Sequence, residues 1–311
     1  MDSDRRFAEL VAPLRDDVVS GASVLSRTAA DVIRRAAVRL QAGSIEELRW
    51  GLGEVSRRIL DAQPAMAPLA ALVRDVLQAV EEADTLEHGR HAAASAADRF
   101  RSDLEARSEA AALAAAAVLP VGGMVATLSS SATVRRLLAE EAGPRGITVL
   151  CFESRPVNEG RDMASALARA GVDVVFAVDA AAQLLVPQAD AVLIGADSIG
   201  DLGVVNKIGS CVVVHAARVA GVPVHVLADE TKILPRGFPQ VLDDDRPGTE
   251  VWDAPAGVRI WNRYFEVVPM EWVTSVVTDL GVQTPEALED RRAELDFPIG
   301  LRAWAASRRR D

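Results

Sequence analysis

The feature that most constrains the fold is a change of pattern at Pro120, after which short apolar runs alternate with helical segments. Five of these runs have the length of a β-strand: residues 123–128, 147–151, 172–176, 191–194 and 222–227. Strand-length runs separated by helices are typical of a parallel sheet with helices on both faces. Such sheets bind ligands beyond the carboxyl ends of their strands, so the residues that follow each run are candidates for chemistry.

Up to Leu119 the chain has apolar residues at three- and four-residue spacing and few β-branched runs, which indicates helices. Ser44 followed by Glu47 predicts a capping box at the start of one of them. We therefore predict an α/β protein in which a helical domain over residues 1–119 precedes a domain with a mostly parallel sheet over residues 120–311.

The composition excludes several classes of protein. With 50% hydrophobic and 25% charged residues the chain is ordinarily globular, neither disordered nor collagen-like. A formal charge of -11 argues against nucleic acid as the main partner. The most apolar stretch, residues 110–119, is about half the length that a bilayer requires, so no membrane partner is expected. Two cysteines, Cys151 and Cys211, without a recognisable secretory leader predict a soluble protein of the reducing cytoplasm.

Polar segments follow the first two apolar runs. Ser129, Ser130 and Ser131 form a turn before a predicted helix, where hydroxyls and free backbone N–H groups bind anions, although the same serines could simply cap that helix. After the second run, Arg155 lies in a loop stiffened by Pro156 and could hold a phosphate through two hydrogen bonds.

Further candidates follow the fourth run. Asp197 comes directly after it, where partial burial favours the protonated carboxyl that a proton donor needs. Asn206 and Lys207 are predicted to open another helix, a place suited to a phosphate or a sugar hydroxyl. The structural alternative is an N-cap for Asn206 and a solvated charge for Lys207. Lys207 and Lys232 are the only lysines in a chain rich in arginine, which points to a need for a compact ammonium.

No metal or other cofactor is predicted. The four histidines, His88, His91, His215 and His225, do not pair with cysteines or carboxylates at metal-ligand spacing. The chain has neither a glycine-rich dinucleotide fingerprint nor a Walker loop. The polar segments after the strands together predict a pocket for a phosphorylated small molecule that bears hydroxyl groups.

Several motifs, in order along the chain, carry a family resemblance. They are residues 20–23, the serine turn 129–131, residues 153–156 with 159–160, residues 195–197, residues 206–209, Lys232 and residues 262–269. In these motifs the chain resembles the family of translation initiation factor 2B regulatory subunits (alpha, beta, delta), methylthioribose-1-phosphate isomerase and ribose-1,5-bisphosphate isomerase. The resemblance implies a Rossmann-like C-terminal domain, a homodimer, and a sugar-phosphate pocket between the two domains.

The resemblance also implies roles for single residues. The isomerases of this family convert an aldose 1-phosphate into a ketose 1-phosphate without metal or nucleotide. Asp197 would be the proton donor, and Asn206 and Lys207 would hold the substrate. The implied binding set further includes Ser130, Ser131, Arg155 and Glu159.

A phosphate-contacting Arg-Gly-Ala motif of the family is only partly present. Gly21 and Ala22 match its last two positions and are predicted to bind substrate, but Ser20 stands where the arginine belongs. The replacement for that arginine is left open among Arg90, Arg155 and Arg161.

A second departure concerns the catalytic cysteine. The isomerases carry it in a Thr-His-Cys turn, which here reads Thr127-Leu128-Ser129. A serine hydroxyl is far less acidic than a thiol, so Ser129 can replace a thiolate only with a neighbouring base. Cys151 is expected to be inert core. Cys211 is expected on the first helical turn after Lys207, where a helix N-terminus would lower its pKa, although a packing role is favoured.

Two functions follow from this departure. The first is a sugar-phosphate aldose–ketose isomerase that uses Asp197 as its acid and base, with Ser129 or a water in the place of the cysteine. The second is a noncatalytic regulatory protein that senses a phosphosugar or a nucleotide and acts through protein partners, as the initiation-factor subunits do.

Overall fold

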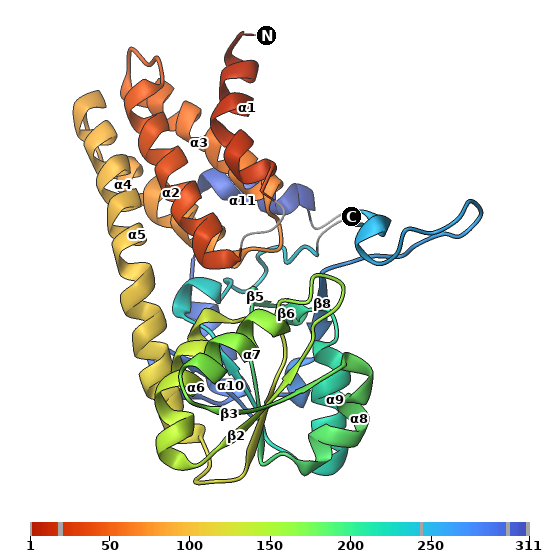
Figure 1. Cartoon of the computed structure of the whole chain (residues 1–311). Helices are drawn as coiled ribbons and strands as arrows, with labels where there is room; N and C mark the ends of the chain where they lie inside the picture. The colour runs from red at the N-terminus through yellow and green to blue at the C-terminus, as the bar shows by residue number, and fades with distance from the viewer. Residues whose placement is uncertain (1, 18–20, 243–244, 297–298, 309–311) are drawn as a thin grey trace. The chain divides into compact units, whose positions relative to one another are not determined.

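The computed structural model describes residues 2–17, 21–242, 245–296 and 299–308 (Figure 1). The chain divides into two compact units. Unit 1 comprises Met1–Ala106, Thr231–Val241 and Arg292–Asp311, and unit 2 comprises Arg107–Glu230 and Leu242–Arg291. The domain boundary after residue 119 stays a prediction.

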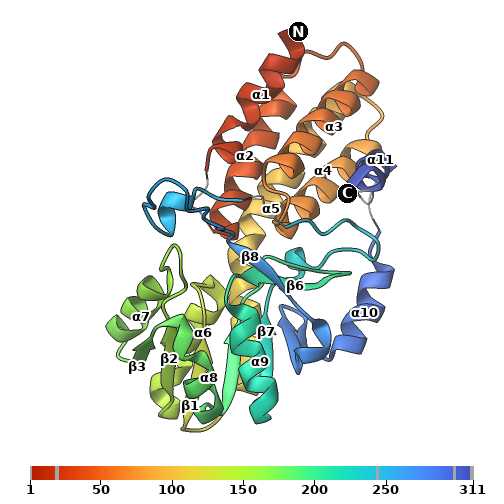
Figure 2. The same ribbon diagram turned by 90° about the vertical axis from the view of Figure 1, so that its right-hand side faces the viewer.

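Unit 1 is helical, as the apolar spacing predicts. Its helices are α1 (Asp2–Arg15), α2 (Ala22–Arg39), α3 (Ile45–Ala62), α4 (Ala67–Glu81), the first part of α5 (Leu86–Ala115), and α11 (Ile299–Arg308). Helices α1 to α4 pack side by side (Figure 2), with Ile33, Leu48 and Leu69 fully buried. Helix α11 contacts α3, where the Trp304 indole donates a hydrogen bond to Asp61 at 3.1 Å. No helix in the described part of the chain is long and apolar enough to cross a membrane.

The predicted helix start at Ser44 is confirmed. Ser44 is the N-cap of α3, and its hydroxyl accepts a hydrogen bond from the backbone N–H of Glu47 at 3.2 Å. The Glu47 carboxylate reaches back one residue further than a standard capping box, to the N–H of Gly43 at 2.7 Å. Two of the N–H groups that the first turn and its approach leave unpaired are thereby satisfied.

Unit 2 is built on a seven-stranded sheet of order β10-β9-β7-β4-β1-β2-β3. Its strands are β1 (Met124–Thr127), β2 (Thr148–Phe152), β3 (Asp173–Ala177), β4 (Ala191–Ile194), β7 (Val224–Leu227), β9 (Ser275–Thr278) and β10 (Gly281–Gln283). All neighbours are parallel except the β9–β10 pair. Each of the five predicted runs overlaps one of these strands, so the prediction of a mostly parallel, Rossmann-like sheet is confirmed.

Helices cover both faces of this sheet (Figure 1). They are α6 (Ala132–Arg145), α7 (Gly160–Arg169), α8 (Ala182–Leu185), α9 (Ser210–Ala220) and α10 (Pro285–Glu294). On one face α6, α7 and the last turns of α5 bury Leu137, Met163 and Ala115 against Val125 and Val149 of the sheet. Helices α8 and α9 cover the other face. Short 3₁₀ helices in the described residues span Ala116–Val118, Asp179–Ala181, Val186–Gln188, Glu230–Lys232, Gly248–Glu250 and Met270–Trp272.

A second, antiparallel sheet corrects one prediction. It consists of β5 (Ser198–Gly200), β6 (Gly203–Lys207) and β8 (Phe265–Val268), in the order β5-β6-β8. Asn206 and Lys207 end β6 and do not open a helix. Two β-branched valines precede them, which favours a strand. Helix α9 begins only at Ser210, after Gly209, whose φ of 98° suits glycine.

Replacing the capping hydroxyl of Ser44 is expected to destabilise unit 1. Ser44→Ala leaves the Glu47 N–H without its acceptor, so the free energy of unfolding should fall by about 1 kcal/mol. Ser44→Asp is the matched control, because aspartate also caps helices well. Urea unfolding followed by circular dichroism measures both variants, and equal midpoints for Ser44→Ala and Ser44→Asp would contradict the assigned cap.

Candidate functional site

Two polar side chains from separate segments of unit 2 contact the carboxylate of a third residue. Ser129 follows β1, Glu159 immediately precedes α7, and Lys207 ends β6. The Glu159 Oε1 atom accepts hydrogen bonds from Lys207 Nζ at 2.8 Å and from Ser129 Oγ at 3.1 Å. We name these three residues the Glu159 cluster. The Lys207 and Glu159 side chains are only 12% and 17% exposed, so this ion pair is screened little by water.

Two aromatic rings complete the surroundings of the lysine. The Lys207 ammonium lies 4.7 Å from the centre of the Tyr264 ring and 5.3 Å from that of Phe265, the residue paired with it across the β6–β8 ladder. Both distances allow a cation–π interaction. The alternative of a solvated Lys207 charge is therefore wrong.

The turn that carries Ser129 is fixed by the loop after β2. Ser154 Oγ accepts a hydrogen bond from the Ser129 N–H at 2.7 Å. Asp179 in turn accepts from the backbone N–H groups of Ser154 and Arg155, at 2.8 and 2.7 Å. Sequence reasoning assigned no role to Ser154 or Asp179. The available signal was the position of Asp179, three residues after the third apolar run ends at residue 176.

The backbone around Glu159 adopts conformations that side chains rarely permit. Ser129, Ser154 and Asn158 have φ values of 70°, 62° and 66°, in the left-handed region. Gly160 leaves no room for a side chain, because a Cβ atom there would lie 1.8 Å from the carbonyl oxygen of Phe152. Such conformations cost free energy and collect at functional sites.

One oxygen atom of the Glu159 carboxylate could accept a further hydrogen bond. Its Oε2 atom is buried and bonds to no described residue, although buried polar atoms are usually paired. The Thr127 hydroxyl, at the end of β1, is likewise buried and unpaired among the described residues. Both atoms lie on segments that lead into the predicted site.

Asp197 lies half-buried between β4 and β5. Its N–H donates to the carbonyl oxygen of Val205 at 2.8 Å, which places it beside the end of β6. Two residues earlier, a Cβ atom on Gly195 would lie 2.7 Å from Ser131 Cβ and 3.9 Å from Asn206 Oδ1. The segment after β4 therefore adjoins both the serine turn and β6.

The sequence left open that Asn206 and one of the turn serines are simply helix N-caps; this is wrong for Asn206 and correct for Ser131. Asn206 is buried, and its Nδ2 donates to Ser210 Oγ at 2.9 Å, whereas Gly209 occupies the N-cap of α9. Asn206 is therefore not an N-cap. Ser131 is the N-cap of α6 and accepts from the N–H of Val134 at 3.4 Å. Ser130 lies half-buried in the same turn.

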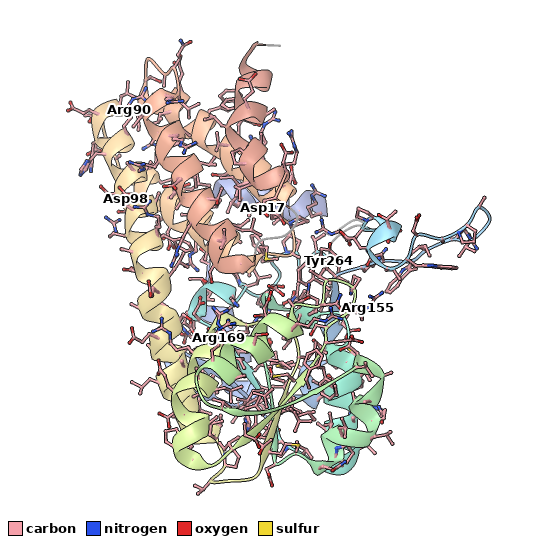
Figure 3. The ribbon with its side chains drawn as sticks, in the orientation of Figure 1. Asp17, Arg90, Asp98, Arg155, Arg169 and Tyr264 are labelled. Atoms are coloured by element: carbon pink, nitrogen blue, oxygen red, sulfur yellow. The ribbon has the colours of Figure 1, made fainter. Side chains whose placement is uncertain are left out.

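The predicted phosphate contacts lie in both units. Arg155 is exposed in unit 2 (Figure 3), and its guanidinium donates to the carbonyl oxygen of Val251 at 2.9 Å. Gly21 and Ala22 belong to unit 1, where Gly21 is the N-cap of α2. Ser20 lies outside the described residues. The binding roles of Arg155, Gly21 and Ala22 stay predictions.

The two other arginines considered for the missing phosphate contact differ in their surroundings. The Arg90 guanidinium, labelled in Figure 3, donates to the carbonyl oxygens of Ala37, in the last turn of α2, and of Leu40, the C-cap of that helix. It thus satisfies carbonyls that a helix end leaves unpaired. Arg161 is 65% exposed and lies 4.0 Å from the Glu153 carboxylate.

Neither cysteine is activated. Burial raises the pKa of Cys151 to about 12. Burial and the neighbouring Glu266 carboxylate together raise the pKa of Cys211 to about 12. The expectation that the N-terminus of α9 lowers the pKa of Cys211 is wrong, because Glu266 occupies that end and accepts from the Cys211 N–H at 2.7 Å. The Cys211 thiol donates to the carbonyl oxygen of Val267 at 3.0 Å, which fits the packing role.

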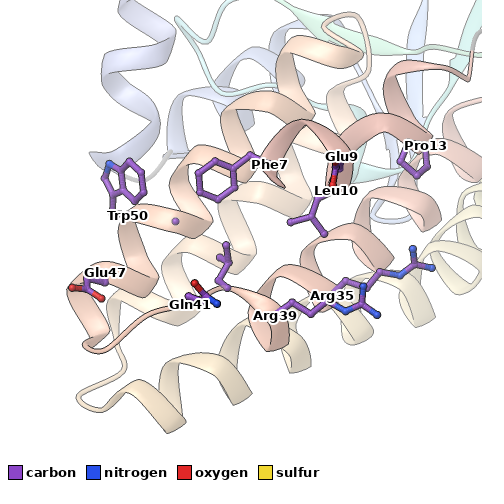
Figure 4. A pocket seen from close by; sticks show the side chains of 11 residues that line it. Phe7, Glu9, Leu10, Pro13, Arg35, Arg39, Gln41, Glu47 and Trp50 are labelled. Carbon is purple, nitrogen blue, oxygen red and sulfur yellow. The ribbon is translucent and has the colours of Figure 1, made fainter. Parts of the chain in front are cut away.

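Unit 1 has a separate cavity of about 650 Å³ (Figure 4). Phe7 and Leu10 from α1 and Trp50 from α3 form much of its apolar lining, and Arg35 and Arg39 from α2 add charge. None of the site residues predicted from the sequence lines it. The described residues also include no group of three or more His, Cys, Asp or Glu side chains placed to hold a metal ion.

The architecture and the cluster at the strand ends define an α/β protein with a helical unit and a Rossmann-like sheet, of the kind that binds small molecules beyond its strands. The chain belongs to the initiation factor 2 subunit family, whose model matches residues 18–285. The resemblance stated from the motifs is thereby confirmed.

Individual relatives include enzymes and an initiation factor. A ribose 1,5-bisphosphate isomerase of Methanocaldococcus jannaschii is 26% identical over 285 residues, which cover 89% of this chain and 91% of that protein. A methylthioribose-1-phosphate isomerase of Gemmatimonas aurantiaca is 30% identical over 302 residues, covering 92% of this chain and 87% of that protein. The crystal structure of the Pyrococcus horikoshii translation initiation factor eIF-2B matches with a TM-score of 0.76 at 26% identity, covering 90% of this chain and 97% of that chain.

The raised pKa values predict slow alkylation of both cysteines. At pH 8 a thiol of pKa about 12 is ionised in roughly one molecule in ten thousand, and only the thiolate reacts. Iodoacetamide should therefore modify the folded protein at least about a hundredfold more slowly than the protein unfolded in guanidinium chloride, as followed by mass spectrometry. Modification of folded Cys211 at the unfolded rate would contradict this assignment.

Proposed function

We propose that this chain is a sugar-phosphate aldose–ketose isomerase that converts an aldose 1-phosphate into a ketose 1-phosphate without the family's cysteine. The observation that carries the proposal is the hydrogen bond from Ser129, at the cysteine position, to the Glu159 carboxylate. Ser129 needs a neighbouring base to act in place of a thiol. The relatives named as isomerases, at 26% and 30% identity, support the same reaction class.

In this reaction a phosphate blocks the anomeric oxygen, so the sugar ring must open with help from an acid. Asp197 donates a proton to the ring oxygen as the bond from C1 to that oxygen breaks, and hydrogen then moves from C2 to C1. Lys207 supplies a positive charge at the site, and Asn206 lies beside it. The further binding residues are Ser130, Ser131, Arg155, Gly21 and Ala22. The proposal includes a cytoplasmic homodimer and no cofactor.

A regulatory protein that binds a phosphosugar or a nucleotide is the second candidate. The observation in its favour is that both thiols are held protonated, with pKa values of about 12, so neither supplies the thiolate of the enzymes. The similarity to the Pyrococcus horikoshii initiation factor is consistent with this role. Such a protein would bind the sugar phosphate, leave it unchanged, and act through protein partners.

Proton NMR separates the two candidates. The purified protein is mixed with ribose 1-phosphate, ribose 1,5-bisphosphate or methylthioribose 1-phosphate, and the anomeric signal is followed. Loss of that signal with growth of a ketose establishes an isomerase. Line broadening of a sugar that is never converted establishes the regulatory candidate, and the search then moves to protein partners.

Asp197→Asn is expected to abolish turnover and to leave sugar-phosphate binding largely intact. The amide keeps the shape of the side chain but cannot donate the proton, and general acid catalysis contributes about 10²- to 10⁴-fold to rate. Asp201→Asn, in the exposed β5–β6 turn, is the matched control. Turnover follows from the NMR assay and binding from line broadening. Unchanged turnover in Asp197→Asn would eliminate the acid role.

A further inference from the structure

We infer that Glu159, and not Ser129, is the base that carries the proton between C2 and C1. This role rests on the proposed function and assigns its missing component, the group that takes the place of the family's thiolate. Glu159 then contacts the reacting carbons, whereas Ser129 and Lys207 position its carboxylate.

The direction of the hydrogen bond between the two residues supports this assignment. Ser129 Oγ donates its hydrogen to Glu159 Oε1, and Lys207 Nζ lies 2.8 Å from the same atom as the partner in an ion pair. An ionised carboxylate is a pure acceptor and can take a proton directly. A serine hydroxyl must first lose its own. Glutamate bases move protons between adjacent carbons in isomerases of unrelated folds.

The position of Glu159 is fixed from several sides. It occupies the N-cap position of α7, and the next residue, Gly160, packs directly against the carbonyl of Phe152. Lys207 and Ser129 hold Oε1, while Oε2 has no partner among the described residues. The side chain as a whole is 17% exposed while its Oε2 atom is buried, so the carboxylate is held in place and largely withdrawn from water. Such preorganisation is what an efficient base requires.

The proposed step balances as follows. Asp197 protonates the ring oxygen while the bond from C1 to that oxygen breaks, and C1 becomes an oxocarbenium carbon bonded to the phosphate oxygen. Glu159 removes the C2 proton, and the released electron pair forms the C1–C2 double bond of an enol phosphate. Glu159 then returns its proton to C1 as the C2 hydroxyl yields its proton to the Asp197 carboxylate. The product is a C2 ketone, and both carboxyl groups regain their starting states.

Three variants test this division of roles in the NMR assay. Glu159→Gln removes the base at constant size and should lower kcat by at least about 10²-fold. Ser129→Ala removes only a positioning hydrogen bond and should cost less than about a hundredfold. Glu153→Gln is the matched control, because Glu153 lies in the same loop and its side chain is also 17% exposed. The control should retain wild-type turnover.

Glu159→Asp adds a rescue test. It keeps the charge on a shorter side chain and should regain part of the activity that Glu159→Gln loses. Line broadening of the sugar phosphate must persist in Glu159→Gln, since a base is not required for binding. The proposal is overturned if Glu159→Gln retains turnover within about tenfold of the wild type, or if Ser129→Ala is the more damaging change.

Wild-type turnover in D₂O gives a readout that does not depend on any variant folding. A proton carried by a carboxylate exchanges with solvent during its stay, so part of the ketose should contain deuterium at C1. A direct hydride shift from C2 to C1 leaves no deuterium there, and that result would overturn the role of Glu159 while leaving the isomerase activity established. Failure of the wild type to convert any of the three sugars would instead overturn the proposed function itself.

Discussion

The burial of the Lys207 ammonium group is the constraint on which the arrangement of the candidate site depends. Lys207 is 12% exposed, and a charge withdrawn from water is tolerated only when it is paired. The partner is Glu159, supported by the rings of Tyr264 and Phe265. Because Lys207 ends β6 and Glu159 immediately precedes α7, this pair joins the small antiparallel sheet to the loop after β2. Removing either partner would leave an uncompensated charge, so the two segments hold each other in place.

A series of hydrogen bonds connects the Lys207–Glu159 ion pair to the ends of neighbouring strands in the large sheet. Asp179, beyond β3, holds Ser154, beyond β2; Ser154 holds the backbone of Ser129, beyond β1; and the Ser129 side chain reaches Glu159. The ends of three neighbouring parallel strands thus form one connected structure. Each link in this series is a hydrogen bond of 3.1 Å or less, although the Oε2 atom of Glu159 at its end has no partner among the described residues. The Ser129 turn is therefore held by hydrogen bonds from two sides, with its hydroxyl in contact with the Glu159 carboxylate.

The sequence predicted those parts of the fold that depend on local pattern. Five apolar runs identified five of the six parallel strands, all but β9, and Ser44 marked a helix start. The small sheet was missed because its strands are short and partly polar, although the valines before Asn206 were a signal for β6. The environment of Cys211 could not be predicted, since Glu266 lies 55 residues later and reaches it only through long-range strand pairing. The candidate site residues Ser129, Arg155 and Asp197 were predicted by their place after strands, whereas the contacts around them depend on tertiary packing.

The left-handed backbone at Ser129, Ser154 and Asn158 has a consequence for how this protein can change over evolutionary time. Each such conformation costs of the order of 1–3 kcal/mol for a residue with a Cβ atom, least for asparagine. Glycine at these positions would relieve the strain, but it would also remove the hydroxyls of Ser129 and Ser154 and loosen the turns. Selection for stability alone would favour that exchange, and selection for a rigid site opposes it. At these three residues the chain therefore has a less stable backbone conformation and, in return, more rigid turns.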